Sequence, residues 1–215
     1  MEITYIGHSC FKIKGKELTI VIDPYNPEDV GYKLPKLEAD VLLISHEHAD
    51  HNYKEGVTGY RLLIDAPGEY ETKDTFVYGI ETFHDNKDGA ERGKNIMYLI
   101  EMDGFNILHT GDLGHELSKE TLEKIPNVDV LLVAVGGVVT IDAKGASDII
   151  SELEPGFVIP MHYYENEKTE KLGKLEKFLD EMGADGKAKR EEKLKLSNKN
   201  DIPEETTVVV LEPQH

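Results

Sequence analysis

The sequence predicts an α/β fold in which strands and helices alternate along one chain. Its clearest strands are short apolar runs such as 128–135, which suit the buried interior of a sheet, and its longest amphipathic helix is expected at 167–182. Three apolar strands, ending at Ile44, Leu108 and Ile159, pass into loops that carry histidine or aspartate. Strands mixed with helices, with polar sites at strand ends, are typical of α/β proteins.

The first part of the chain favours short strands that lead to one histidine-rich loop. Strands are predicted at residues 2–6, 10–14, 18–22 and 41–44. Pro24 ends the third of them, because proline cannot donate a ladder hydrogen bond. The three prolines within 24–36 indicate an irregular loop.

The middle of the chain predicts further strands, at residues 62–64, 76–83, 96–102 and 105–108. Asp103-Gly104 is a strong turn dipeptide and is expected to join the last two as a hairpin. The segment 66–69 is interpreted as a turn, because it contains Pro67-Gly68.

The last part of the chain mixes strands with helices. Strands are predicted at 128–135, 157–159 and 206–211, and helices at 118–124, 146–153 and 167–182. Ser118 is the expected N-cap of the first helix, and Pro155-Gly156 ends the second. The lysine-rich segment 187–195 is interpreted as a solvated connection.

The most informative stretch follows the strand 41–44. It places three imidazoles and two carboxylates within six residues, namely His46, Glu47, His48, Asp50 and His51. Imidazole nitrogen and carboxylate oxygen are good ligands for Zn²⁺ and similar ions. A loop can direct His46 and His48 toward one ion while Asp50 and His51 face a second. A charged surface turn does not need histidine at three of six positions, so we predict a metal-binding loop.

These residues resemble a known family. His46-x-His48-x-Asp50-His51 is similar to the H-x-H-x-D-H signature of the metallo-β-lactamase fold. Other motifs resemble the small, single-domain branch of metal-dependent hydrolases; they are Gly7-His8-Ser9-Cys10-Phe11, Asp23-Pro24, Gly111-Asp112 and Pro160-Met161-His162-Tyr163. The resemblance covers residues 1–165. It implies a four-layer αββα sandwich with metals at one edge, and we expect one domain over 1–215.

The resemblance also implies a ligand set for two divalent ions. The first ion is expected on His46, His48 and His84. The second is expected on Asp50, His51 and His162, with Asp112 bridging both. Zn²⁺ is the expected metal and Mn²⁺ the alternative.

Other polar residues near these motifs are candidates for catalysis or support. His8 and His115 are expected to contact substrate or shuttle a proton, and Asp50 to handle the proton of the attacking water. Asp23 is expected to steady the metal loop through hydrogen bonds. His109 is interpreted as a packed histidine at a strand end.

The predicted reaction is hydrolysis of a small molecule. A metal-bound water has a pKa of roughly 7, which makes hydroxide available to attack an ester, lactone, amide or phosphodiester. Tyr163 is either a packed tyrosine or a donor to the oxyanion. The segment 85–94 holds Lys87, Arg92 and Lys94, and is either a mobile lid for an anionic substrate or a solvated loop. The resembling branch includes lactone hydrolases and phosphodiester-cleaving relatives, which this sequence does not separate.

Two other classes are kept open. One is an iron-dependent oxidoreductase of the same fold, either an oxygen- or NO-reducing di-iron protein or a mononuclear iron dioxygenase. The di-iron branch generally carries Glu in place of His48, and usually a flavin domain as well. The other is a non-catalytic metal-binding protein, against which the complete ligand set argues.

Composition limits the partners. The chain has 42 acidic and 24 basic residues and a formal charge of −18, which disfavours nucleic acid and anionic membranes. Its single cysteine, Cys10, fits a reducing compartment and is expected to be a small core residue. No signal peptide is recognised and the apolar run 130–139 is too short to span a membrane, so a cytoplasmic location is expected. A homo-oligomer is left open.

Overall fold

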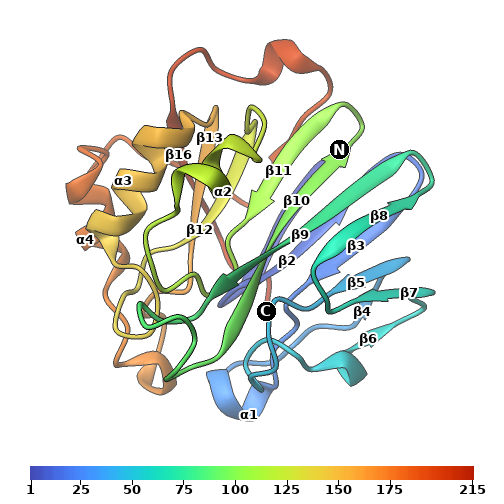
Figure 1. The fold of residues 1–215 in the computed structure, drawn as a ribbon, viewed down its shortest axis with the longest axis horizontal. Helices are drawn as coiled ribbons and strands as arrows, with labels where there is room; N and C mark the ends of the chain where they lie inside the picture. The colour runs from blue at the N-terminus through green and yellow to red at the C-terminus, as the bar shows by residue number, and fades with distance from the viewer.

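Two large β-sheets pack face to face in the computed structural model, which describes residues 1–215 (Figure 1). The first sheet has, in spatial order, β15 (Leu194–Lys195), β1 (Glu2–Gly7), β2 (Cys10–Lys14), β3 (Thr19–Ile22), β5 (Val41–Leu43) and β7 (Leu62–Ile64). The second has β14 (Lys189–Glu191), β16 (Thr207–Leu211), β13 (Phe157–Met161), β12 (Val130–Ala134), β11 (Phe105–His109), β10 (Lys94–Met102), β9 (Thr75–Phe83) and β8 (Gly68–Thr72).

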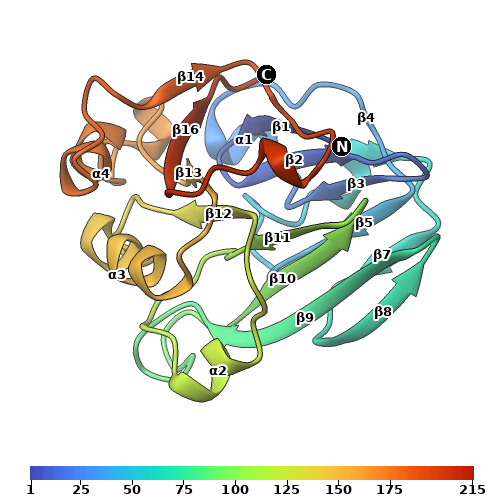
Figure 2. The ribbon, with the colours of Figure 1, turned by 90° about the horizontal axis from the view of Figure 1, so that it is seen from above.

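Helices and short segments cover the outer faces of both sheets. Figure 2 shows that the second sheet is covered by three helices, α2 (Lys119–Glu123), α3 (Ala143–Leu153) and α4 (Leu175–Glu181). Outside the first sheet the chain forms α1 (Pro27–Val30) and a two-stranded ribbon of β4 (Leu37–Glu38) and β6 (Val57–Thr58). Single 3₁₀ turns occur at Lys54–Gly56, Glu167–Thr169 and Lys199–Asp201. The layered α/β architecture predicted from the sequence is confirmed. None of the helices combines the length and hydrophobicity needed to cross a bilayer.

The apolar runs in the first sheet are continuous because both faces of this sheet are buried. Side chains alternate between faces along a strand. In β5, Val41 and Leu43 belong to the main core between the sheets, whereas Leu42 belongs to a smaller core beneath α1 and β4. Cys10 is a buried free thiol in that smaller core, as expected.

Parallel strand pairing brings the ends of β5, β11 and β13 to one edge of the sandwich. In the second sheet β11, β12 and β13 are parallel neighbours, and in the first sheet β3, β5 and β7 are parallel neighbours. Carboxyl ends of parallel strands lie at the same edge of a sheet. The loops after β5, β11 and β13 therefore come together at one edge of the sandwich.

Side-chain caps explain where three helices begin. Ser118 caps α2 as predicted, with its side chain accepting a hydrogen bond from the Thr121 amide. The helix expected from residue 146 begins at Ala143 instead, because the Asp142 side chain accepts from the Gly145 amide. Within the loop 24–36, Asn26 caps the short helix α1 in the same way.

The predicted helix over 167–182 is wrong in its first half. The chain forms one 3₁₀ turn and then an irregular segment before α4 begins at Leu175. Gly173 is the reason, since its amide donates to the Gly136 carbonyl oxygen at 2.6 Å. A β-carbon at this position would lie 2.9 Å from that same oxygen, so the close approach needs glycine. This contact fixes the chain against the loop after β12.

Two segments interpreted as turn or connection are strands. Residues 68–72 form β8, which pairs antiparallel with β9 across the turn Lys73-Asp74. The lysine-rich segment contains β14 and β15, each at the edge of a sheet. Charged side chains are common on edge strands, where they oppose further strand pairing. Leu194 is buried within this charged run and ties it to the core.

Candidate metal centre

The metal loop is held to the first sheet by the buried carboxylate of Asp23. This carboxylate accepts hydrogen bonds from the Ser45 amide at 2.7 Å, the Ser45 hydroxyl at 2.6 Å and His51 Nδ1 at 3.0 Å. The predicted supporting role of Asp23 is confirmed. Because Nδ1 of His51 donates to Asp23, its Nε2 is left to face the centre of the site.

The candidate ligands form two neighbouring groups. One consists of His46, His48 and His84, and the other of His8, Asp50, His51 and His162. Within each group the nearest nitrogen and oxygen atoms lie within 4.8 Å of one another. The structure thus brings His84 to the metal loop across a long separation in sequence. His8, which was expected to contact substrate or shuttle a proton and not to bind metal, lies inside the second group.

Asp112 stands between the two groups. Its Oδ2 lies 3.2 Å from His162 Nε2, 3.3 Å from His84 Nε2, 3.4 Å from His51 Nε2 and 3.9 Å from His46 Nε2. One oxygen therefore contacts imidazoles of both groups. This is the position of a ligand that two ions can share.

The backbone conformation at Gly111 directs the Asp112 carboxylate toward the ligand groups. Gly111 has φ of 55°, and a β-carbon there would lie 2.3 Å from Asn95 Oδ1. The buried Asn95 accepts from the Asp112 amide at 2.9 Å and donates to the Thr110 carbonyl at 2.9 Å. Sequence reasoning missed Asn95, whose only signal is a polar side chain beside the apolar strand 96–102.

Burial and charge set the protonation of the site. Burial lowers the pKa of His46 to about 3, so this imidazole is neutral and its nitrogen can bind a cation. Burial opposes ionisation of Asp112, but His162 and His51 hold the pKa of this carboxyl well below its usual range. Burial also opposes charge on His51, but Asp112 raises the pKa of this imidazole well above its usual value. In the metal-free protein a proton on His51 offsets buried carboxylates, and a divalent cation would replace that proton.

The donor atoms fit a divalent metal. His46 Nε2, His51 Nε2 and Asp112 Oδ1 are buried and have no hydrogen-bond partner. Buried polar atoms are normally paired, so a cluster of unpaired nitrogen and oxygen atoms indicates a cation site. Imidazole nitrogens with carboxylate oxygens suit Zn²⁺ and Mn²⁺.

Within the second group, His8 contacts both Asp50 and His162. Its Nε2 lies 3.2 Å from Asp50 Oδ2, and its ring centroid lies 4.3 Å from that of His162. Only 3% of His8 is exposed, whereas the Asp50 side chain is 36% exposed and open to substrate. His8 and Asp50 therefore form a hydrogen-bonded pair at the mouth of the site.

Other predicted residues lie outside the cluster. His115 does not join it, because its Nε2 accepts from the Phe83 amide at 3.1 Å and its Nδ1 donates to the Glu116 carbonyl at 2.7 Å. The structure therefore does not bring His115 into the metal-binding groups, and its ring supports the strand that leads to His84. His109 is packed as predicted, with Nε2 donating to the Ser9 carbonyl at 3.0 Å. Tyr163 is buried against Tyr5.

The loop after His84 is fixed by Asp85. Its carboxylate accepts from four backbone amides, those of Lys87, Gly89, Glu91 and Arg92. Burial opposes ionisation of Asp85, but these hydrogen bonds lower its pKa to about 2. The segment 85–94 therefore forms a hydrogen-bonded wall beside His84.

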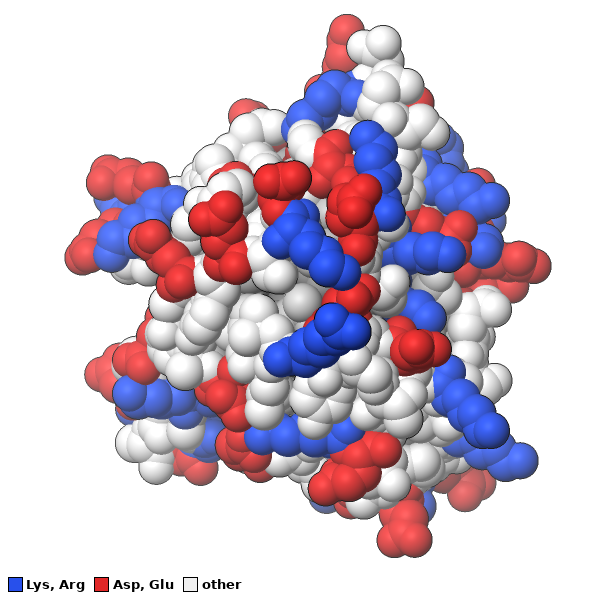
Figure 3. Space-filling view, turned by 90° about the vertical axis from the view of Figure 1, so that its right-hand side faces the viewer, with Lys and Arg blue, Asp and Glu red and all other residues white.

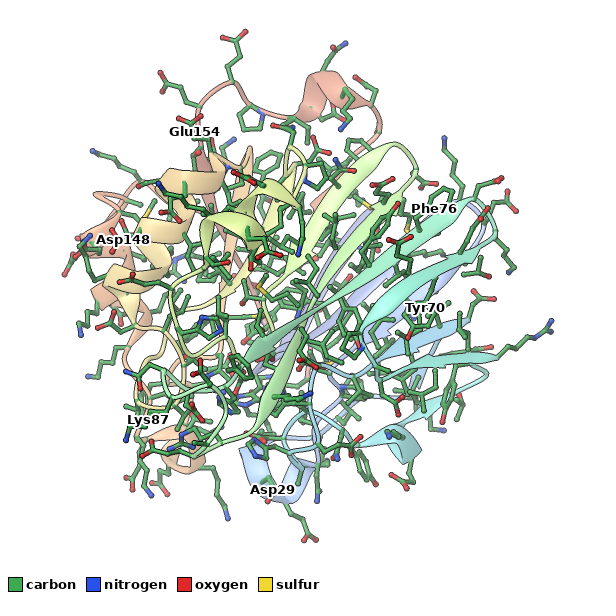
Figure 4. The ribbon with its side chains drawn as sticks, in the orientation of Figure 1. Asp29, Tyr70, Phe76, Lys87, Asp148 and Glu154 are labelled. Carbon is green, nitrogen blue, oxygen red and sulfur yellow. The ribbon has the colours of Figure 1, made fainter.

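A cleft of about 360 Å³ opens between this wall and the metal loop, with His46 and His48 among its lining residues. Lys94 pairs with Glu81 at 2.8 Å, so its charge is already matched. Lys87 pairs with Glu91 and lies at the margin of the molecule (Figure 4). Arg92 also lines the cleft but forms no ion pair. It is the cation of this loop that remains free for a ligand.

Comparisons with known proteins agree with this geometry. Residues 2–162 match the family described as the β-lactamase superfamily domain. A Thermococcus onnurineus protein named as a metal-dependent hydrolase is 30% identical over 191 residues, covering 76% of this chain and 84% of the relative.

Solved structures show the same fold. A Thermotoga maritima structure, assigned as a zinc-dependent hydrolase of the metallo-β-lactamase superfamily, is 35% identical with a TM-score of 0.80, and the match covers 98% of this chain and 97% of that one. A di-iron β-hydroxylase from Streptomyces venezuelae is 15% identical with a TM-score of 0.58, covering 75% of this chain and 44% of that one. The latter similarity shows the fold alone.

Proposed function

Because this chain belongs to the metallo-β-lactamase superfamily and is a metal-dependent hydrolase, we propose that it uses two divalent ions to cleave a small ester, lactone or phosphodiester. The observation that carries the proposal is the position of Asp112, whose Oδ2 contacts imidazoles of both ligand groups. Zn²⁺ is the proposed metal, with Mn²⁺ as the alternative.

The proposed ligands follow the two groups. His46, His48 and His84 would hold the first ion, and Asp50, His51 and His162 the second, with Asp112 shared. Two ions held there supply Lewis-acid stabilisation of the developing oxyanion and lower the pKa of a coordinated water to roughly 7.

The residues at the mouth of the site would move the proton. Asp50 Oδ1 or Oδ2 would accept the proton of the attacking water, since its side chain is partly exposed. His8 Nε2 donates to Asp50 Oδ2 at 3.2 Å, so it would orient the carboxylate that takes this proton and returns it to the leaving group. Burial of His46, His51 and His84 shields these three ligands from bulk water.

Charge supports a small-molecule substrate. The chain carries a formal charge of −18, which repels polyanions. On the face that includes β6, β7 and β8, acidic and basic side chains are interspersed and form no broad basic patch (Figure 3). A nucleic-acid substrate is therefore disfavoured.

The proposal is tested by metal removal followed by a substrate panel. Protein stripped with a chelator and reloaded with Zn²⁺ or Mn²⁺ is assayed on lactones, phosphodiesters, carboxylic esters and thioesters. We expect hydrolysis of at least one class only after reloading. Turnover that is unaffected by metal removal would overturn the proposal. Activity that requires iron and develops visible absorption would favour an oxidoreductase instead.

We propose further that the substrate carries an anionic group bound by Arg92. In Arg92→Ala we expect KM for an anionic substrate to rise about fivefold to tenfold with kcat little changed, because a hydrogen bond to a charged group contributes roughly 1.5–3 kcal/mol and exposure reduces it. The matched control is Lys87→Ala, whose ammonium is paired with Glu91 in the same loop. Steady-state kinetics at two salt concentrations measure the effect. An equal rise in KM for a neutral substrate would contradict an electrostatic role.

A further inference from the structure

Glu165 collects three hydrogen bonds beside the metal centre. It follows the proposed ligand His162 by three residues in the loop after β13. Its Oε2 accepts from the Tyr32 hydroxyl at 2.5 Å and from the His8 amide at 3.2 Å, and its Oε1 accepts from the Tyr5 hydroxyl at 3.2 Å. Glu165 belongs to none of the metal-binding groups.

The residue that Glu165 holds has an uncommon backbone conformation. His8 has φ of 57°, in the left-handed region that few non-glycine residues adopt. Its carbonyl oxygen accepts from the His162 amide at 2.8 Å and shares the single proton of the Tyr5 hydroxyl, 2.9 Å away, with Glu165 Oε1. With its amide on Glu165, both polar backbone groups of His8 are paired. Such a conformation persists only when its surroundings fix it, and it often marks a functional site.

The partners of Glu165 are themselves fixed. Tyr32 stacks on His215 with ring centroids 4.0 Å apart and packs edge-on against Tyr25 at 5.1 Å. Tyr5 is fully buried and packs against Phe11 at 5.0 Å. The Glu165 carboxylate is therefore oriented from two sides by rigid aromatic side chains.

We propose that Glu165 is a positioning residue for His8. Its carboxylate fixes the left-handed backbone of His8, which in turn aims the imidazole at Asp50 Oδ2. A carboxylate suits this task, because it only accepts hydrogen bonds and all three neighbouring groups donate. An amide would present an NH₂ group to at least one of these donors. The catalytic importance of His8 rests on the proposed function. The contacts between Glu165 and His8 do not depend on it.

A double-mutant cycle separates positioning from general structure. In Glu165→Gln we expect kcat to fall about tenfold with KM within about twofold, because displacing a reacting group by about 1 Å can cost up to 10²-fold. In the His8→Ala background the same change should have no further effect, since there is no imidazole to position. The control is Glu176→Gln, which changes an exposed carboxylate lining the same pocket as Tyr32 and Glu165 and should match the parent protein. Equal effects of Glu165→Gln with and without His8 would overturn the proposal.

A second readout does not depend on activity. In metal-free protein labelled with ¹⁵N-histidine, Glu165→Gln should shift the ring signals of His8 and leave those of His115 unchanged. Unshifted His8 signals would overturn the inference even if kcat falls. If His8→Ala is fully active while the signals shift, the positioning stands and the proposed role of His8 in catalysis fails. Should Glu165→Gln fail to fold, Tyr32→Phe, which removes one oriented donor, should give a smaller shift of the same signals, and no shift would contradict the proposal.

Discussion

Replacing Asp112 with asparagine should reduce bound metal to less than one ion per chain and lower kcat by about 10³-fold or more. The carboxylate Oδ2 lies within 3.4 Å of imidazole nitrogens of His51, His84 and His162. The neutral amide keeps the shape but loses the charge that both ions would share. Metal ions supply several kcal/mol of transition-state stabilisation, and each 1.36 kcal/mol corresponds to a factor of ten in rate.

The control for Asp112→Asn is another buried aspartate. Asp129 accepts from the Asn106 amide at 2.6 Å and pairs with Lys199, away from the metal-binding groups. In Asp129→Asn we expect lower thermal stability with full metal content and full activity of the folded protein. Metal analysis and turnover on the same preparations make the comparison. Full metal content in Asp112→Asn would show that this residue does not bridge.

The second large effect is expected for Asp50→Asn. In the proposed mechanism Asp50 binds the second ion and accepts the proton of the attacking water, and it lies 3.2 Å from His8. General acid–base help typically contributes 10²–10⁴-fold, so we expect kcat to fall by at least about 10²-fold. Because the Asp50 side chain is 36% exposed, the melting temperature should change little. The first ligand group lacks Asp50 and should retain its ion.

The matched control for Asp50→Asn lies in the same loop. Glu47 is exposed, pairs with Lys54 at 3.3 Å and belongs to no ligand group. Glu47→Gln should keep the activity and the metal content of the parent protein. Near-normal turnover of Asp50→Asn, with Glu47→Gln also normal, would contradict the proposed proton transfer.

Much of this architecture could be predicted because its signals are local in sequence. The buried strands are apolar on both faces, so runs such as 41–44 stand out without any partner. The metal loop is a single stretch, and its support by Asp23 follows from the turn that ends β3. The candidate ligands His84 and His162 could be identified because each follows a strand directly.

What sequence reasoning missed depends on contacts between distant residues. Gly173 approaches the backbone of Gly136, and this contact replaces the first half of the expected helix. Glu165 meets the His8 amide, 157 positions away, so no spacing rule could reveal it. The charged strands β14 and β15 look like loops because an edge strand needs few apolar side chains. His115 was a candidate because it lies close to Asp112 in sequence. Both of its ring nitrogens, however, form hydrogen bonds with backbone groups.

The central claim is that two ions share Asp112, and anomalous diffraction from crystals grown with Zn²⁺ tests it most directly. We predict two anomalous peaks roughly 3.5–4 Å apart. One should lie about 2.0–2.1 Å from nitrogens of His46, His48 and His84, and the other near Asp50, His51 and His162. A single peak, or His84 or His162 more than about 6 Å from any metal, would contradict the account, since real Zn–N bonds are roughly 2.0–2.1 Å.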